Sequence, residues 1–443
     1  MRILFVIYDN EGAQNPIPMG SAYVAGYLKQ QGYDVSYYSQ DVYHYPEEHL
    51  TDYLNHNHFD VVGLGFCAGY FQYRKILKIC EGINKSDDRP LLILGGHGPS
   101  PVPEFFLEKT GADAVVVGEG EVSMLYIVKS LELNGNIPSI IKSEPLHDID
   151  LSPYYKTLPM EYYLNGQWFT MKPTDKFLPM ITSRGCPYSC NFCQRLEKSI
   201  RFRSIPAIVE ELGRYVTDYH VNFVQFWDEL FVSSPQRVYE LTQAIKPSNI
   251  NYWCTARVNI VTSDIIKMLK ESGCVYIDYG IEQFDNDALR AMNKKQTEKQ
   301  IIDAIEMTKA EGIKIGFNII WGNVGDTVGS LIKSANLLRK YNDYGQLRTI
   351  RPVTPYPGCP LYQTALDRGL LTGPEDFYEK HKNVELLTCN FTNIPDDEFH
   401  GLLDMYNGGI IGDYFEHKKN EMRRKFHSTY FDKEYSFRGA RHT

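Results

Sequence analysis

The chain of 443 residues contains no run of about twenty apolar residues, so the sequence predicts no membrane-spanning helix. Its first residues, MRILFVIYDNEG, enter an apolar strand pattern directly. They lack the charged start, apolar middle and small-residue cleavage site of a signal peptide. Runs of Lys and Arg are absent before the C-terminal tail, and the formal net charge is −9, so a nucleic-acid partner is not expected. We therefore expect a cytoplasmic protein.

Most of the nine cysteines are scattered through apolar surroundings, where a thiol behaves as a small hydrophobic group. Disulfides are not expected in a reducing compartment. The scattered cysteines are Cys67, Cys80, Cys254, Cys274, Cys359 and Cys389. The other three, Cys186, Cys190 and Cys193, share the stretch SRGCPYSCNFCQR (183–195) with the spacing C-x3-C-x2-C. This cluster alone has the spacing of a set of metal ligands.

A fourth ligand is missing from the cysteine cluster. Structural zinc sites close their shell with four ligands, usually from two separated pairs, and Asn191 and Gln194 are poor substitutes. In an iron–sulfur cube each thiolate binds one iron, so three cysteines leave one iron open for another molecule. The cube fits this spacing better, while zinc and a purely structural cluster are the alternatives.

The first 145 residues alternate short apolar strands with amphipathic helices. This pattern predicts a doubly wound, parallel α/β sheet, a Rossmann-like domain. Ligands of such sheets bind at the carboxyl ends of the strands. Here those ends are the glycine-rich segments GFCAGYF, GGHGPSP and GEGE, and glycine lets a backbone approach a large ligand closely.

The rest of the chain divides into three parts. Residues 146–178 are rich in Pro and Tyr and are expected to be a linker, with one hairpin around NGQW. From residue 179 to 370 six strand–helix steps follow, too few for a complete eight-stranded barrel but suited to a partial (β/α)6 barrel with its chemistry on the loops after the strands. Residues 371–443 are expected to form a helical extension that ends in a charged, solvated tail.

The cysteine spacing, the aromatic Phe192 before the last cysteine, and the place of the loop after the first strand of a partial barrel resemble the radical S-adenosylmethionine (SAM) enzymes. This resemblance implies a 4Fe-4S cluster whose open iron is chelated by the amino and carboxylate groups of SAM. It also implies reductive cleavage of SAM to a 5'-deoxyadenosyl radical, which removes hydrogen from an unactivated carbon. An electron donor such as flavodoxin or ferredoxin is the expected protein partner.

The same resemblance implies roles for further side chains around SAM. Phe192 would lie against the adenine. Of the strand-end acids Asp228 and Glu229 in FWDELF, Glu229 would help to hold the methionyl amine. Arg257 in CTARVN would pair with a carboxylate or ribose oxygen, and Glu282 in YGIEQF matches the family's G-I-E motif near the ribose. The simpler alternatives are a helix-capping or surface acid and an ion-paired arginine.

Two later segments depart from the family pattern. IIWGNVGDT resembles the G-x-P-G-E-T turn, with Val324 in place of Pro and Asp326 in place of Glu, and the backbone of Ile320 and Trp321 would border the adenine. Cys359 in PYPGCPLY stands where the family commonly has Thr. A cysteine there would donate a hydrogen atom or hold a substrate, while a small residue in a Pro-Gly turn is the simpler reading.

The N-terminal domain resembles the cobalamin (B12)-binding domain of the B12-dependent radical SAM class, on PIPMGSAYVAGYLKQQGYDV, VVGLGF, LLILGGHGPSPVPE and DAVVVGEGE. The D-x-H-x-x-G sequence that ligates cobalt from below is absent, which implies base-off cobalamin without a histidine ligand. A domain that binds nothing is the alternative. The residues expected around cobalamin are Met19, Gly20, Gly65, Phe66, Gly95, Gly96, His97, Gly118, Glu119 and Gly120.

Together the two resemblances imply an enzyme that methylates an unactivated carbon or phosphorus centre of a small molecule through methylcobalamin. Ring contraction, cyclisation or hydroxylation with the same cofactors is the main alternative. A methylthiotransferase normally has three further cysteines in its N-terminal domain, where this chain has only Cys67 and Cys80. A non-enzymatic metal-binding scaffold is the remaining class. The substrate itself is not encoded in any motif.

Overall fold

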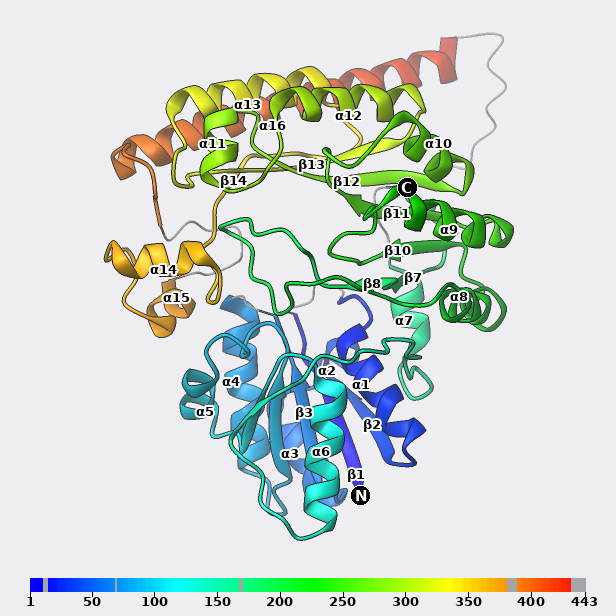
Figure 1. Cartoon of the computed structure of the whole chain (residues 1–443), viewed down its shortest axis with the longest axis vertical. Helices are drawn as coiled ribbons and strands as arrows, with labels where there is room; N and C mark the ends of the chain where they lie inside the picture. Colours follow the sequence, from blue (N-terminus) through cyan, green and yellow to red (C-terminus); the bar gives the residue numbers. More distant parts are fainter. Residues whose placement is uncertain (11–14, 68–69, 167–169, 381–388, 432–443) are drawn as a thin grey trace.

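The computed structural model describes residues 1–10, 15–67, 70–166, 170–380 and 389–431. It contains two parallel six-stranded sheets, one above the other, with a helical C-terminal region packed against both (Figure 1). The expected fold class, a Rossmann-like domain followed by a partial barrel and a helical extension, is confirmed.

The N-terminal sheet has the strand order β2-β1-β3-β4-β5-β6, and every neighbouring pair is parallel. Its strands are β1 (Arg2–Ile7), β2 (Asp34–Ser39), β3 (Val61–Gly65), β4 (Leu91–Gly95), β5 (Ala114–Val117) and β6 (Ile140–Lys142). Its helices are α1 (Met19–Gln30), α2 (Gln40–Tyr43), α3 (Glu47–His56), α4 (Tyr70–Asn84), α5 (Pro103–Thr110) and α6 (Gly120–Glu132).

The side chains of β1 are buried on both faces of the sheet, which explains why helices cover both faces. Successive side chains of a strand point to opposite faces. Ile3 and Phe5 pack into a core with α1 and α6, while Leu4 and Val6 pack into a second core with α3, α4 and α5. A strand that is apolar at every position is therefore stable only between two helical layers.

The second sheet has the order β7-β10-β11-β12-β13-β14, again all parallel. Its strands are β7 (Phe177–Met180), β10 (Phe223–Phe226), β11 (Asn251–Ala256), β12 (Cys274–Glu282), β13 (Lys314–Trp321) and β14 (Arg351–Pro352). The connecting helices are α8 (Ile205–Tyr219), α9 (Pro235–Ile245), α10 (Ser263–Glu271), α11 (Asn286–Ala291), α12 (Glu298–Ala310) and α13 (Val328–Tyr341), with a 3-10 turn at Lys246–Ser248. A short antiparallel pair, β8 (Ser183–Arg184) and β9 (Arg201–Phe202), frames the cysteine loop.

The expected linker is partly ordered. Helix α7 (Met160–Leu164) lies within it, and the buried Tyr163 hydroxyl donates to Asp41 at 2.7 Å. The expected hairpin is centred on NGQW, residues 165–168, and its second half lies in residues 167–169, outside the described residues. Aromatic side chains of this segment pack into the barrel core, as Tyr155 does against Tyr215. This segment therefore joins the two domains through packed side chains.

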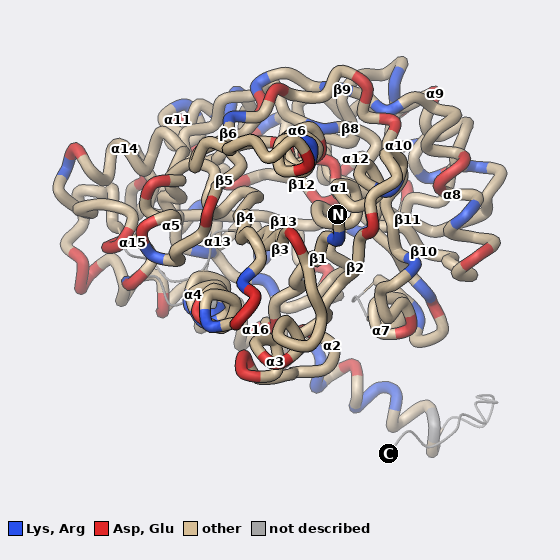
Figure 2. Tube along the Cα trace, turned by 90° about the horizontal axis from the view of Figure 1, so that it is seen from below, with Lys and Arg blue, Asp and Glu red and all other residues tan. Residues whose placement is uncertain are grey.

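The C-terminal region consists of α14 (Pro360–Asp367), α15 (Pro374–Lys380) and α16 (Asp396–Phe431). Helix α15 lies against α4 and α5, where Tyr378 stacks on Phe105 with ring centroids 5.8 Å apart. Helix α16 crosses the barrel beside α13, and Phe399 stacks on the fully buried Trp321 at 4.3 Å. The end of α16 extends away from the body and carries many charged residues (Figure 2).

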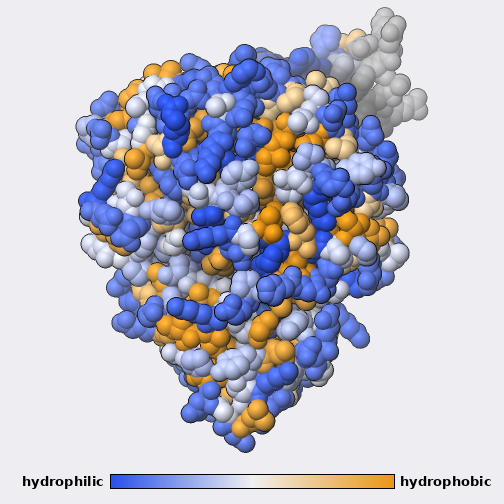
Figure 3. All heavy atoms as spheres, in the orientation of Figure 1, coloured by the Kyte–Doolittle hydropathy of each residue, from blue (hydrophilic) through white to orange (hydrophobic). Residues whose placement is uncertain are grey.

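Hydrophilic residues predominate on the face shown in Figure 3, and the hydrophobic ones lie in separate patches. Among the helices of the described residues, none combines the length and the apolar character that a membrane crossing requires.

Candidate active site

The cysteine loop follows β7 and is anchored at its start by the buried Asp228, which lies just after β10. One oxygen of Asp228, Oδ1, accepts hydrogen bonds from the Thr182 backbone N–H at 2.9 Å, from the Thr182 hydroxyl at 3.0 Å and from the Ser183 hydroxyl at 2.6 Å. Gly185 then turns the chain with a φ of +89°, and a Cβ there would lie 2.0 Å from the Ser199 carbonyl oxygen. Only glycine fits this close approach.

The far end of the loop is held by three other segments. The amide side chains of Asn191 and Asn323 exchange two hydrogen bonds of 2.9 Å. The Asn191 backbone N–H donates to the Met292 carbonyl at 3.0 Å, and its carbonyl accepts from the Leu361 N–H at 2.8 Å. Asn293 donates to the Ser189 carbonyl at 2.7 Å. A loop fixed at both ends can hold three thiols in a set arrangement.

None of the three thiols is in a disulfide, and one of them, Cys190, lies beside a guanidinium. Arg257 stacks on the Tyr188 ring at 3.8 Å and brings Nη1 to 3.5 Å from Cys190 Sγ. Burial raises the pKa of Cys186 and raises that of Cys193 to about 12, which favours the protonated thiols, and a bound metal that replaces the proton would favour the thiolates.

The donor set fits a 4Fe-4S cluster. In the described part of the chain, no three His, Cys, Asp or Glu side chains converge closely enough to bind a single metal ion. A cube does not need that convergence, because each thiolate binds a different iron.

The neighbouring acids Asp228 and Glu229 have different environments. Asp228 is buried and anchors the loop, whereas the Glu229 side chain is exposed. Partial desolvation by the surrounding chain raises the pKa of Glu229, and the negative charge of Glu229 in turn raises the pKa of Cys186 and Cys193. Glu229 is therefore the acid available to a ligand beside the cysteines.

Glu282 lies at the carboxyl end of β12, where a register shift interrupts the ladder with β13. Its φ of +65° is uncommon for a residue with a side chain, and such strain concentrates at functional sites. Lys294 forms a buried ion pair with Glu282 at 2.8 Å and places its ammonium 5.6 Å from the centre of the Phe192 ring. Lys294 therefore contacts both Glu282 and Phe192, the two residues expected near the ribose and the adenine of SAM.

The end of β13 and the turn that follows it contain both core residues and residues nearer the site. The Trp321 side chain points into the core against α16, while Ile320 is partly buried beside the second core. Asp326 is buried and accepts hydrogen bonds from the Gly322 and Asn323 N–H groups at 3.0 and 2.9 Å. This carboxylate shapes the turn, and burial raises its pKa to about 6.

The glycine loops of the N-terminal sheet leave open surface for a large ligand. A Cβ at Gly20 would meet nothing within 4 Å, and one at Gly65 would first meet Ser21 Oγ at 3.7 Å. Gly96 and Gly118 have φ values of +96° and +98°, and a Cβ at Gly96 would lie 2.7 Å from the Phe66 carbonyl oxygen. Met19 is buried at the start of α1, and Gly95 ends β4. This glycine-lined surface fits a large cofactor.

Other residues of the glycine loops contact the barrel directly. Glu119 forms ion pairs with Arg201 at 2.5 Å and with Arg184 at 3.2 Å, and Arg184 also pairs with Glu121 at 2.7 Å. Gly120 begins α6 against Val24. Exposed His97 accepts a 2.8 Å hydrogen bond at its carbonyl from Gln194, next to Cys193. The glycine loops and the cysteine loop therefore face the same interface.

Sequence reasoning missed the residues that hold these loops, because their partners are distant in the chain. They are Tyr188, Asn191, Arg184, Arg201, Lys294 and Asn323. Cys359 is 3% exposed, directly precedes α14 without a side-chain capping hydrogen bond, and packs in the core that α14 shares with the N-terminal sheet. Burial raises the pKa of Cys359 to about 11.

Two domain families match the chain: the B12 binding domain over residues 7–127 and the radical SAM superfamily over residues 180–338. The chain belongs to the cobalamin-dependent radical SAM enzymes. This B12-dependent radical SAM protein is an enzyme of the methyltransferase class, and its cofactors are a 4Fe-4S cluster, SAM and cobalamin.

Several known proteins are similar to this radical SAM enzyme. An uncharacterized methyltransferase of Pyrococcus horikoshii is 27% identical over 402 residues, which cover 84% of each chain. An anaerobic magnesium-protoporphyrin IX monomethyl ester cyclase of Rubrivivax gelatinosus is 25% identical over 402 residues, 83% of this chain and 70% of the cyclase. The solved structure of the methyltransferase TsrM of Kitasatospora setae, with cobalamin and a 4Fe-4S cluster bound, has the same fold. Its TM-score is 0.68 at 14% identity, over 84% of this chain and 79% of TsrM.

Proposed function

We propose that this enzyme transfers a methyl group from SAM to an unactivated carbon or phosphorus centre of a small molecule. One observation carries the proposal: the glycine loops and the cysteine loop meet at one interface, joined by the ion pairs of Glu119 with Arg184 and Arg201 and by the contact of Gln194 with His97. When bound, the cluster with SAM supplies one-electron chemistry and cobalamin supplies a methyl carrier.

The chain's own residues would then bind and orient these groups. Cys186, Cys190 and Cys193 would hold three irons. Glu229 would accept hydrogen bonds from the methionyl amine, because it is the exposed acid beside the cysteines.

Phe192 would contribute a flat surface for the adenine, and Ile320 a second apolar edge. Lys294 limits the movement of Glu282 and approaches the Phe192 ring, so the two would keep their places when SAM enters. Arg257 would stabilise the thiolate of Cys190.

The open glycine surface would receive cobalamin at Gly20 and Gly65, with Met19 and Phe66 beneath it, while Gly96 lets its loop pack closely on the Phe66 backbone. Cobalamin would bind base-off, because the chain has no D-x-H-x-x-G sequence. Glu119 would act by holding the glycine loops on the barrel, since its carboxylate is already in ion pairs. A flavodoxin or ferredoxin would supply the electrons.

Anaerobic turnover with methyl-labelled SAM and a small-molecule extract tests the proposal. Label should appear in a product of low molecular mass together with 5'-deoxyadenosine, and a Cys190→Ala variant should give neither. The similarity to a cyclase keeps cyclisation without methyl transfer as a second candidate. Deoxyadenosine that accompanies substrate loss without a labelled product would refute methyl transfer and favour that candidate.

A further inference from the structure

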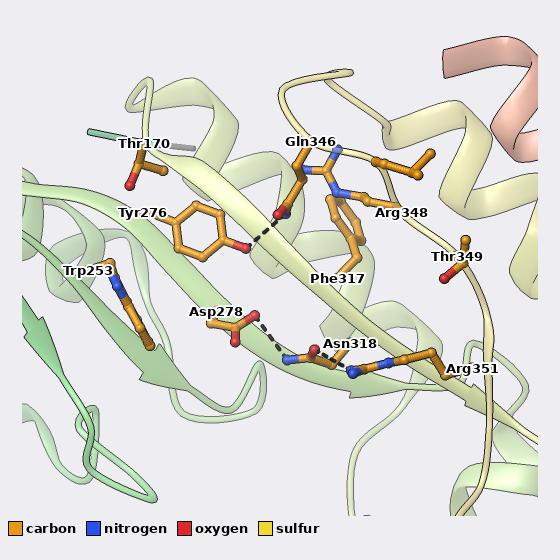
Figure 4. Close-up of a pocket in the computed structure, with 11 residues that line it drawn as sticks. Thr170, Trp253, Tyr276, Asp278, Phe317, Asn318, Gln346, Arg348, Thr349 and Arg351 are labelled. Atoms are coloured by element: carbon orange, nitrogen blue, oxygen red, sulfur yellow. Dashed lines mark hydrogen bonds between the residues drawn. The ribbon is translucent and has the colours of Figure 1, made fainter. Parts of the chain in front are cut away.

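The inner face of the barrel sheet contains a separate cavity of about 280 Å³ (Figure 4). Two aromatic residues, Trp253 from β11 and Tyr276 from β12, form one side of it, and Asp278 and Asn318 lie on its floor. Cavities of this size suit a small ligand or one end of a larger one.

This cavity lies deeper in the barrel than the cysteine loop. Asp278 precedes Glu282 by four residues on β12. At about 3.3 Å per residue this places Asp278 roughly 13 Å below the level of Glu282. The cavity is therefore placed to hold a part of the substrate remote from the reacting atom, and remote binding orients a substrate for reaction.

Asp278 is the unusual group in this cavity. Its Oδ1 accepts one hydrogen bond, from the neutral amide of Asn318 at 3.0 Å, and the carboxylate has no ion-pair partner among the described residues. Arg351 reaches it only through Asn318, to whose Oδ1 it donates at 3.0 Å (Figure 4). The pKa of Asp278 is raised to about 6, mainly by burial; the charge of Glu282 acts in the same direction, while the hydrogen bond from Asn318 and the charges of Arg351 and Arg348 act against it. Asp278 is half-buried, and although Arg348 and Arg351 also line the cavity, neither forms an ion pair with it among the described residues, so its carboxylate is available to a charged group of a ligand.

The surrounding chain makes room for this carboxylate. On the neighbouring strand, a Cβ at Gly316 would lie 2.0 Å from Asp278 Oδ1 and 2.4 Å from the Tyr276 hydroxyl. Trp253 and Tyr276 meet edge to face, with ring centroids 6.4 Å apart. Aromatic faces attract cations, and an unpaired carboxylate beside them completes a cation site.

We propose that this cavity binds a protonated amine of the substrate, which forms a charge-assisted hydrogen bond with Asp278 against the rings of Trp253 and Tyr276. The assignment rests on the proposed function, because it describes the substrate of the same barrel. It predicts that the substrate carries an ammonium group at its non-reacting end, within about 280 Å³ of cavity space.

Matched probes test the charge preference without turnover. Tryptamine and phenethylamine are compared with their uncharged alcohols, tryptophol and 2-phenylethanol, and with indole-3-acetate and phenylacetate. Binding to the anaerobically reconstituted enzyme is followed by titration of the ligand NMR signals. The amines should bind roughly ten-fold more tightly than the alcohols and carboxylates, because hydrogen bonds to charged groups are the stronger ones.

Three variants locate the effect. Asp278→Asn keeps the acceptor for Asn318 and should remove the preference for amines. Trp253→Leu should weaken amine binding about three- to ten-fold, the range expected for a lost cation–π contact. Asp303→Asn, on the outside of the barrel in α12, should bind the amines as the unchanged enzyme does. Each variant's melting temperature shows that it is folded.

The proposal is wrong if the alcohols or carboxylates bind as tightly as the amines, if Asp278→Asn retains the preference, or if neither amine binds. These outcomes are independent of the proposed function. An enzyme that binds amines at Asp278 but never transfers label from SAM would refute methyl transfer and leave the cavity assignment standing. Label transfer to a substrate without an amine would support methyl transfer and refute the cavity assignment.

Discussion

Replacing Asp228 by alanine removes the single oxygen that accepts three hydrogen bonds at the start of the cysteine loop. The lost partners are the Thr182 N–H, the Thr182 hydroxyl and the Ser183 hydroxyl, all buried. An unsatisfied buried donor costs about 1–3 kcal/mol, and hydroxyls can turn to other acceptors more easily than an N–H can. Burial also raises the pKa of Asp228, so removing its charge offsets part of the loss. We expect a net loss of about 2–4 kcal/mol.

That loss corresponds to a fall in melting temperature of roughly 5–10 °C for a domain of this size. The loop should also lose its arrangement, so that anaerobic reconstitution of Asp228→Ala yields less than half the iron and sulfide of the unchanged enzyme. Asp228→Asn retains an oxygen at the Oδ1 position and should keep both the cluster and most of the stability. Asp218→Ala, an exposed acid of α8, is the matched surface control.

For the neighbouring Glu229 we expect the opposite: the cluster is kept, but its response to SAM is weakened. Because Glu229 is exposed and anchors nothing, Glu229→Gln should keep the iron content and melting temperature but weaken the change in the cluster's EPR spectrum when SAM is added. The reasoning is refuted if Asp228→Ala assembles a full cluster at unchanged stability, or if Glu229→Gln loses the cluster.

Two further changes test other parts of the structure. Gly185→Ala should prevent cluster assembly, because its Cβ would lie 2.0 Å from the Ser199 carbonyl oxygen. Gly213→Ala in α8, whose Cβ would meet nothing within 4 Å, should assemble the cluster and raise the free energy of unfolding by about 1 kcal/mol. Equal iron contents in the two variants would contradict this reasoning. Burial raises the pKa of Asp278 to about 6, above its unfolded value near 4, so Asp278 costs stability above about pH 6 and costs none below about pH 4. Asp278→Asn should therefore raise the free energy of unfolding at pH 7.5 by roughly 1–3 kcal/mol and lose this advantage at pH 4, as denaturant titrations at the two pH values will show.

The parts of this enzyme that sequence reasoning predicted correctly depend on local pattern. Apolar runs such as RILFVI and LLILG become strands buried on both faces, because no other arrangement hides every side chain. The spacing of Cys186, Cys190 and Cys193 indicated a 4Fe-4S cluster, which the radical SAM match supports, whereas the open iron stays a prediction. The six strand–helix steps likewise gave the partial barrel.

Tertiary structure decided which of these residues are free to bind and which hold the site together. Asp228 and Glu229 are adjacent and chemically alike, yet only the fold buries one beside Thr182 and exposes the other beside the cysteines. Glu119 stands in a glycine-rich loop but is engaged by arginines about 65 and 82 residues away. The sequence by itself determined the two sheets, the cysteine cluster and the glycine loops, since these follow from periodicity and spacing. The hydrogen-bond and ion-pair partners of each side chain depend on contacts between segments that are distant in the sequence, so only the folded chain reveals them.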